Sequence, residues 1–360
     1  MLKFTTRTLW ALAAAAMGVV AGADAFAQQA QQAQQAQQYS LKDLGTLGGS
    51  YSAGYGINAA GEIVGTSYTA KDALLRPFVY RQGRMTDLGT LGGTIGYGYG
   101  VNSAGQITGF SEDAQGSREF LYIFGSMFDI GTLGGATSEG SAINSKWQIT
   151  GVSSTHNNAA QHAFLYSFGS MIDLGTLGGS GSYGYAINDA GQIVGTASDA
   201  LGTYHAFLYA NGTMTDMGSL GGGYGQANGI NRNGQITGIS MTAKQALHAF
   251  LYHAGTMKDL GTLGGARSEG SGINTAGHVI GYSLTAGNAQ HAFLYRNGAM
   301  TDLNALIDPS DPLAAHVTLA EATAINDDNL IVANGIDART NEQHAYLLDC
   351  RHKGKPHKCK

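Results

Sequence analysis

The sequence DLGTLGG, or a close variant of it, recurs along nearly the whole chain of 360 residues. Successive copies are 44, 42, 44, 43, 43 and 43 residues apart, counted between Asp43, Asp87, Asp129, Asp173, Asp216, Asp259 and, in the degraded copy DLNALID, Asp302. Each repeat contains several short segments typical of strands. A fixed period of about 40–45 residues with four strand segments is typical of a β-propeller blade. The repeat therefore predicts a ring of β-sheets.

One repeat shows how the strands are expected to run. Between residues 182 and 218 we predict four strands, at residues 183–188, 192–196, 205–210 and 213–218. Asn211-Gly212 is a strong signal for a two-residue hairpin between the last two strands. This hairpin places Phe207 opposite Asp216 and His205 diagonally close to the same aspartate. Every repeat has an Arg or a His at the position of His205, so we interpret the pair as a repeated structural contact and not as seven ligand sites.

The number of repeats and the two ends of the chain predict how the ring closes. The turn after the first strand begins at Asn58, Asn102, Asn144, Asn188, Asn231, Asn274 and Asn326, which gives seven units. The seventh unit ends after its third strand, whereas residues 39–45 form an extra strand before the first unit. Pairing the two ends leaves no open sheet edge. We therefore predict an all-β fold: a seven-bladed β-propeller of four-stranded antiparallel blades, closed by an N-terminal strand that completes the last blade.

The N-terminal segments indicate export. Residues 1–27 resemble a signal peptide, because Lys3 and Arg7 precede an apolar run too short to span a bilayer, and residues 25–27 offer a cleavage site. A retained anchor is the alternative. Residues 28–38 form a Gln/Ala-rich leader, residues 39–349 the propeller and residues 350–360 a basic tail. We expect a secreted monomer, periplasmic or extracellular, without a membrane span.

The tail contains the two cysteines of the chain, Cys350 and Cys359, together with His352 and His357. These side chains could hold zinc. An exported chain with two cysteines more often joins them, so we predict a disulfide between Cys350 and Cys359, no metal and no cofactor.

The charge of the chain is unevenly distributed. The formal net charge is −5, but residues 28–349 carry −11 because the tail is basic. An acidic body repels phosphate backbones, so nucleic acid is not expected as a partner.

A concatenated motif connects the repeats to a known family. His-Ala-Phe stands at residues 162–164, 205–207, 248–250 and 291–293, and it is followed by a hairpin, MTDLGTLGG and GYGIN-type strands. This combination resembles the HAF-repeat extracellular proteins over residues 39–349. Departures include Arg118-Glu119-Phe120, and Trp147 where a turn glycine is expected. The resemblance implies secretion and a repeat fold, and it implies no reaction or ligand.

Aligned on the seven asparagines, the first strands predict what lines the channel. Alternate positions are almost all Gly, Ala or Ser, which suits close packing of backbones. The intervening positions share one face and should meet at the channel mouth. We take as ligand-binding candidates Tyr51, Tyr55, Tyr97, Tyr99, Tyr183, Tyr185, Tyr224 and Arg267, and as catalytic candidates Glu269, Glu321 and Glu139.

Three functions are compatible with such a mouth. The favoured hypothesis is a secreted binding or scaffold protein that engages a glycan or a protein through its loop face, because tyrosines suit both ligands. The alternative is a glycan-active enzyme, in which Glu269 and Glu321 serve as acid and base of a glycoside hydrolase. A lyase fits less well, because Arg267 is the single basic residue placed there. A purely structural envelope protein is third.

Overall fold

The computed structural model describes residues 38–114 and 116–350. The predicted signal peptide, nearly all of the leader and the tail from residue 351 lie outside the described residues. Cys350, which directly follows the last strand, is buried, but Cys359 lies outside the described residues, so the disulfide stays a prediction. The described part of the chain contains no helix with the length and apolarity that a membrane crossing needs.

The repeat analysed from sequence forms four antiparallel strands, β14 (Gly178–Ile187), β15 (Ile193–Asp199), β16 (Tyr204–Ala210) and β17 (Thr213–Asp216). The predicted hairpin register is confirmed, because Phe207 pairs with Asp216 and Ala210 with Thr213. The first strand begins at Gly178 and not at residue 183. Its glycine-rich start pairs with the end of β15, and glycine has no side-chain pattern from which a strand could be predicted.

The same order of strands recurs along the chain. The innermost, first strands are β2 (Gly48–Ile57), β6 (Gly96–Val101), β10 (Gly134–Ile143), β14, β18 (Gly221–Ile230), β22 (Gly264–Ile273) and β26 (Val317–Ile325). The second strands are β3 (Ile63–Thr69), β7 (Ile107–Glu112), β11 (Ile149–Thr155), β15, β19 (Ile236–Thr242), β23 (Val279–Thr285) and β27 (Ile331–Asp337). The third strands are β4 (Leu75–Arg81), β8 (Ser117–Ile123), β12 (Gln161–Ser167), β16, β20 (Leu247–His253), β24 (Gln290–Arg296) and β28 (Glu342–Asp349). The outermost strands are β1 (Ser40–Asp43), β5 (Arg84–Asp87), β9 (Ser126–Asp129), β13 (Ser170–Asp173), β17, β21 (Thr256–Asp259) and β25 (Ala299–Asp302).

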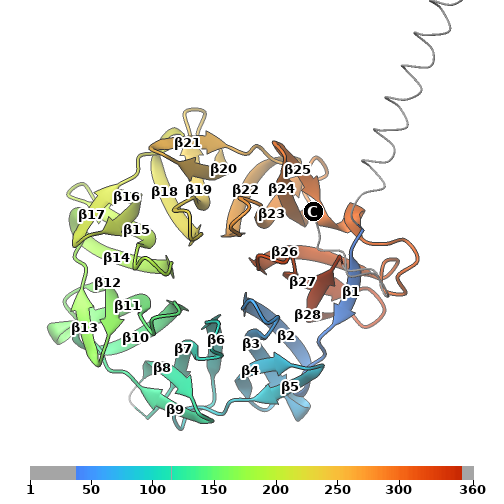
Figure 1. Ribbon diagram of the computed structural model, residues 1–360, viewed down its shortest axis with the longest axis horizontal. Coiled ribbons are helices and arrows are strands. Elements are labelled where there is room, and N and C mark those ends of the chain that lie inside the picture. Colours follow the sequence, from blue (N-terminus) through green and yellow to red (C-terminus); the bar gives the residue numbers. More distant parts are fainter. Residues whose placement is uncertain (1–37, 115, 351–360) are drawn as a thin grey trace, which may run out of the picture.

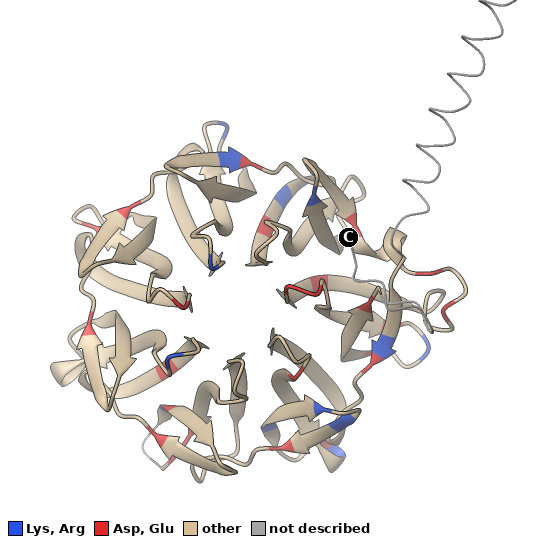
Figure 2. Cartoon of the chain, viewed as in Figure 1, with Lys and Arg blue, Asp and Glu red and all other residues tan. Residues whose placement is uncertain are grey.

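The sheets stand around a central opening, as in a β-propeller, with the first strands facing the axis (Figure 1). Single parallel bridges, such as that between Gln161 and Gly181, connect some neighbouring sheets. Three short 3-10 helices, η1 (Ala70–Asp72), η2 (His156–Asn158) and η3 (Leu303–Leu306), lie in the connections. Charged residues occur as isolated patches on a mostly uncharged ring (Figure 2).

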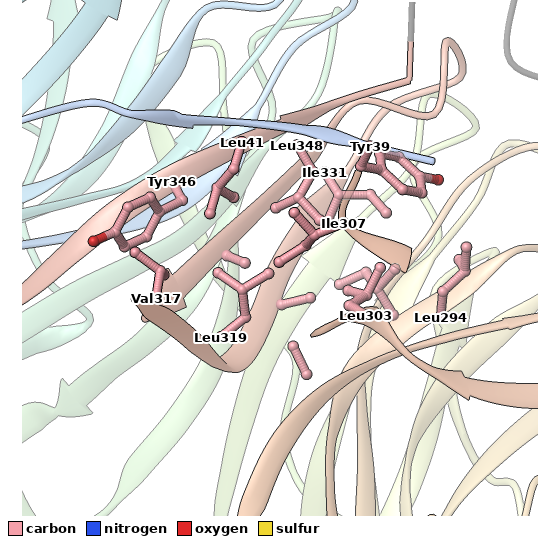
Figure 3. Packing of buried hydrophobic residues seen from close by; sticks show 14 of the residues in the cluster. Tyr39, Leu41, Leu294, Leu303, Ile307, Val317, Leu319, Ile331, Tyr346 and Leu348 are labelled. Carbon is pink, nitrogen blue, oxygen red and sulfur yellow. The ribbon is translucent and has the colours of Figure 1, made fainter. Parts of the chain in front are cut away.

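Strand β1 lies beside β28, at the other end of the chain (Figure 1). Asp43 pairs with Tyr346 and Ser40 with Asp349. Tyr39 precedes β1 and packs with Leu41, Ile307 and Leu348 in the core cluster shown in Figure 3. The described N-terminal segment is therefore held by backbone pairing and by apolar burial.

A buried aromatic ring from the third strand occupies the interior of each sheet. These rings are fully buried and belong to Phe78, Phe120, Phe164, Phe207, Phe250, Phe293 and Tyr346. Burial of a side chain of this size contributes about 2–3 kcal/mol each relative to exposure. The Phe of the His-Ala-Phe motif is thus a core residue.

The histidine–aspartate contacts form as predicted. The Nδ1–Oδ2 distances are 2.6–3.4 Å in His162–Asp173, His205–Asp216, His248–Asp259, His291–Asp302 and His344–Asp43. Arg118 approaches Asp129 at 3.9 Å. Arg76 differs, because its guanidinium donates to the Thr90 hydroxyl at 2.6 Å, and no Arg76–Asp87 ion pair is found within residues 38–114.

Candidate binding site at the wide end of the channel

The narrow end of the channel is lined by asparagines that link neighbouring sheets. Asn58 Nδ2 donates to the carbonyl oxygen of Asn102, and each following asparagine repeats this contact with the next one at 2.8–3.2 Å. Asn326 donates in turn to the carbonyl oxygen of Asn58 at 3.1 Å. All these side chains are buried. From sequence these residues were predicted only as turn positions, because hydrogen bonds between repeats leave no signal in the spacing.

Small residues form the middle of the channel. A Cβ atom on Gly56 would lie 2.6 Å from the Tyr99 carbonyl oxygen, and one on Gly54 would lie 2.5 Å from Val332. The first strand therefore approaches the neighbouring units so closely that no larger side chain fits at these two positions. This agrees with the Gly, Ala and Ser positions that predicted close backbone packing.

At the opposite, wide end lies a cavity of about 510 Å³. It is lined by Tyr55, Tyr99, Glu139, Ser141, Val152, Gln161, Tyr183, Gly184, Tyr185 and Asn228. Cavities of about 300–1,000 Å³ with a few polar groups are typical of small-molecule sites. Five of the predicted candidates thus meet in one cavity, and they come from β2, β6, β10 and β14.

A β-bulge in each first strand carries one of the channel-facing side chains. In β14, Gly184 pairs with Gly195 and Ala186 with Val194, so Tyr185 lies between two paired positions and has no partner. The corresponding bulged residues are Tyr55, Tyr99, Ser141, Tyr185, Asn228, Ser271 and Thr323. Bulges bend a strand and re-aim its side chains, and they are frequent near functional sites.

The bulge also explains a glycine in the second strand. A Cβ atom on Gly151 would lie 1.9 Å from the Glu139 carbonyl oxygen. Glu139 pairs with Val152, and in the same way Tyr97 pairs with Phe110 and Glu269 with Tyr282. Of these second-strand partners, Val152 lines the cavity, Phe110 stacks on Tyr97, and the Tyr282 hydroxyl donates to Glu269. None of the three was among the residues predicted from sequence. The hairpin register could have indicated them, but the bulge displaces that register by one residue.

Aromatic rings cover one side of the mouth. The centroids of Tyr55 and Tyr99 are 5.2 Å apart, and Tyr97 stacks on Tyr99 at 5.8 Å and on Phe110 at 4.9 Å. Burial raises the pKa of Tyr55, Tyr99 and Tyr185, so their hydroxyls stay protonated. Tyr97 contacts the lining residue Tyr99 but is not itself among the lining residues of the cavity.

Glu139 is placed between two tyrosine-bearing strands. It lies on β10, which packs between β6 and β14 (Figure 1). Its side chain is exposed to solvent, although the channel wall removes part of its hydration and raises the pKa of its carboxyl group. Its charge in turn contributes to the raised pKa of Tyr99. Among the described residues that line the cavity, Glu139 is the only charged one.

The other side of the mouth is a polar network centred on Glu269. Its carboxylate accepts hydrogen bonds from Arg267 Nη2 at 3.0 Å, from the Tyr282 hydroxyl at 3.0 Å and from Asn228 Nδ2 at 3.1 Å. The Tyr224 hydroxyl extends the network by donating to the Gln226 side chain at 3.0 Å. Arg267 thus contacts Glu269 directly, whereas Tyr224 is connected to it only through Gln226 and Asn228. Neither Tyr224 nor Arg267 lines the cavity.

Glu321 is the most perturbed carboxyl group on the polar side. Burial, together with the charge of Glu269, raises its pKa to about 7, and a weak hydrogen bond from Ser271 opposes this shift. Neither Glu269 nor Glu321 lines the cavity. Tyr51, the remaining candidate, packs edge-on against Tyr68 at 5.7 Å, outside the lining. Within the described ranges, no three His, Cys, Asp or Glu residues gather closely enough to hold a metal ion.

Comparison with known proteins bears on the fold. A scan against protein-family models found no match, and neither did a search of curated proteins. Among solved structures, the acylaminoacyl peptidase of Pyrococcus horikoshii is similar over 85% of this chain and 52% of its own, with a TM-score of 0.54 and 10% identity. A puromycin-hydrolyzing peptidase of Mycobacterium tuberculosis is similar over 86% and 56%, with a TM-score of 0.51 and 10% identity.

TolB from Acinetobacter baumannii is similar over 79% of this chain and 78% of its own, with a TM-score of 0.43 and 13% identity. The chain spans about half the length of the two peptidases. At such low identity the likeness concerns the fold and not the activity. The two peptidase matches agree with the strand arrangement in Figure 1: this chain has an all-β, propeller-like fold.

Proposed function

We propose that this chain is a secreted, seven-bladed propeller that binds a glycan in the cavity at the wide end of its channel. Two contacts support a closed ring of seven. The asparagine hydrogen bonds run from unit to unit and return from Asn326 to Asn58, and β1 supplies the outer strand beside β28. Secretion rests on the predicted signal peptide and on the resemblance to HAF-repeat extracellular proteins.

The observation that carries the binding function is the cavity of about 510 Å³ whose walls contain four tyrosines. A tyrosine ring offers a flat apolar face on which a sugar ring can stack, and its hydroxyl can form a hydrogen bond with a sugar hydroxyl. Gln161 at the start of β12 places an amide at the rim, where it accepts a hydrogen bond from the Tyr183 hydroxyl at 3.0 Å. Bulged strands of a rigid ring hold these groups, so little ordering is needed on binding.

The proposal is tested by screening the chain from residue 28 onward on a glycan array and by measuring its hits by calorimetry. We expect Tyr185→Leu to weaken binding of the best hit about tenfold, because one stacking face is lost. The matched control is Phe168→Leu, at an outer hairpin where the ring is 97% exposed, and it should bind like the wild type. Absence of any glycan hit, or equal affinity of the Tyr185 variant, would contradict the proposal.

A glycoside hydrolase remains the second candidate, and one observation favours it. Glu321 has a pKa of about 7 beside the hydrogen-bonded carboxylate of Glu269, and two carboxyl groups with unequal proton affinity are what acid–base hydrolysis of a glycoside requires. Incubation of each bound glycan with wild type, Glu321→Gln and Glu269→Gln, followed by measurement of new reducing ends, decides this. Release that disappears in both variants supports the enzyme, and no release by the wild type excludes it for those glycans.

A further inference from the structure

We propose that the wide-end cavity selects ligands that carry an organic ammonium group, in the first place protonated amino sugars, over neutral and anionic sugars. The inference rests on the proposed glycan-binding function and names the charge of its ligand. Its basis is the arrangement of four tyrosine rings and one carboxylate around a single cavity.

Aromatic rings on several walls of a cavity suit an organic cation. The face of a tyrosine ring carries negative electrostatic potential, so an ammonium group placed over it is attracted, and cages of such rings recognise methylated ammonium groups. Here Tyr55 and Tyr99 come from β2 and β6, whereas Tyr183 and Tyr185 come from β14. The rings therefore face the cavity from strands on either side of β10.

The single carboxylate of the cavity wall lies on that intermediate strand. Glu139 is exposed to the cavity and borders Tyr99, whose pKa its charge helps to raise. No hydrogen bond or ion pair within the described residues occupies its carboxylate, unlike that of Glu269. A ligand cation held between the tyrosines would meet this charge without displacing a protein cation.

The surroundings of the cavity reinforce the preference. The polar side of the mouth carries Glu269 and Glu321, and Arg267 is engaged there by Glu269 at 3.0 Å while its guanidinium lies 5.7 Å from the Tyr282 ring centroid. No Lys or Arg stands among the described lining residues of the cavity. An anionic sugar would thus bring like charges together without a free basic partner.

The test compares three tetrasaccharides of matched size on the same protein by calorimetry: a glucosamine tetramer at a pH where its amines are protonated, its fully N-acetylated counterpart, and a galacturonic acid tetramer. We expect the glucosamine tetramer to bind about tenfold more tightly than the N-acetylated one, and the galacturonic tetramer to bind least. Equal affinity for the first two would overturn the charge preference and leave glycan binding intact, whereas tightest binding of the anionic tetramer would overturn it outright.

The variant that isolates the charge is Glu139→Gln. It should lower affinity for the glucosamine tetramer about tenfold and leave affinity for the N-acetylated tetramer unchanged, because size and polarity are kept. The matched control is Asp328→Asn, which removes one exposed negative charge at the narrow end and should change neither affinity. If the Asp328 variant lowered affinity as much, the effect would be that of net charge and the proposed site would be wrong.

A probe without sugar separates this inference from the proposed function. Tetramethylammonium should bind weakly to the wild type and at least fivefold more weakly to Glu139→Gln, as followed by chemical-shift changes of the tyrosine rings. Such binding without any glycan hit would retain the ammonium site and reject the glycan function. No saturable shift of the tyrosine signals would reject the ammonium site.

Discussion

The two ends of the channel are built from the same strands, but the residues at one end are the same in every unit and those at the other end vary. At the narrow end an asparagine follows every first strand, and the asparagine of one unit donates to the backbone of the next. At the wide end the bulged position is Tyr in three units and Ser, Asn or Thr in the others. The asparagine is the same in every unit because each unit must make the same contact with the next one around the ring. Divergence at the other end creates a surface with an aromatic side and an acidic side.

The largest effect is expected when one asparagine of the narrow end is removed. Asn188→Ala should lower the free energy of unfolding by about 3 kcal/mol, since the buried amide links to the Asn231 carbonyl at 3.1 Å and its oxygen accepts two backbone N–H groups. Urea unfolding measures the loss. Asn233→Ala removes an exposed side chain that donates to the Thr275 carbonyl oxygen at 3.1 Å, and it should cost below about 1 kcal/mol. Equal effects of the two variants would remove the structural role assigned to the narrow end.

The second test uses the pH dependence of the wide end. Because Glu321 has a folded-state pKa of about 7, the folded chain holds this proton more tightly than the unfolded chain does. Its contribution to stability is therefore present at low pH and is lost as pH rises from about 4.5 to above 7. Glu321→Gln should be more stable than the wild type at pH 8 by about 2 kcal/mol, allowing for partial exposure, with little difference at pH 5.

Removing the neighbouring Ser271 hydroxyl should change the pH dependence in the opposite direction to Glu321→Gln. Ser271 donates to Glu321 and lowers its pKa, so Ser271→Ala should extend the loss of stability to a higher pH and make it larger. Thermal unfolding between pH 5 and pH 9 measures both variants. If the stability of wild type and of Glu321→Gln changed with pH in the same way, burial would not raise the pKa of this carboxyl group.

The third test compares how much the aromatic side of the mouth contributes to glycan affinity with how much it contributes to the free energy of unfolding. Tyr99→Leu should weaken glycan binding about tenfold, or about 1.4 kcal/mol. The free energy of unfolding should fall by about 1 kcal/mol from the lost ring contacts with Tyr55 and Tyr97. In Asn188→Ala, by contrast, the loss of unfolding free energy should exceed the loss of binding free energy. A Tyr99 variant that unfolds as easily as the Asn188 variant would erase the distinction between the two ends.

The smallest expected effect concerns the turn that follows the narrow end. Trp147 has φ of 64°, whereas the same position in the next unit is Gly191 with φ of 81°. A bulky residue is strained in this left-handed conformation, so Trp147→Gly should raise the free energy of unfolding by about 1 kcal/mol. The matched change, Gly191→Ala, should lower it by about 1 kcal/mol. Equal signs for the two changes would contradict the argument from backbone strain.

Much of each unit could be predicted from local sequence. The pairing of Phe207 with Asp216 followed from the Asn211-Gly212 hairpin, and the contact of His344 with Asp43 followed from the same count applied across the chain ends. The same count did not hold for Arg76, which donates to the Thr90 hydroxyl. The tyrosines of the mouth were found through their shared face, although the reason for their direction, a bulge, was not visible in the sequence.

The repeat period, the strands within a unit and the hairpin registers could be predicted from the residues alone, because they depend on contacts between residues close along the chain. The contacts across units became visible in the folded chain: the linked asparagines, the supporting ring of Phe110, and the gathering of Tyr99, Glu139 and Tyr185 around one cavity. They could not be predicted because distances between units depend on how closely glycine-lined strands pack around the axis. That packing is a property of the whole ring and of no single repeat.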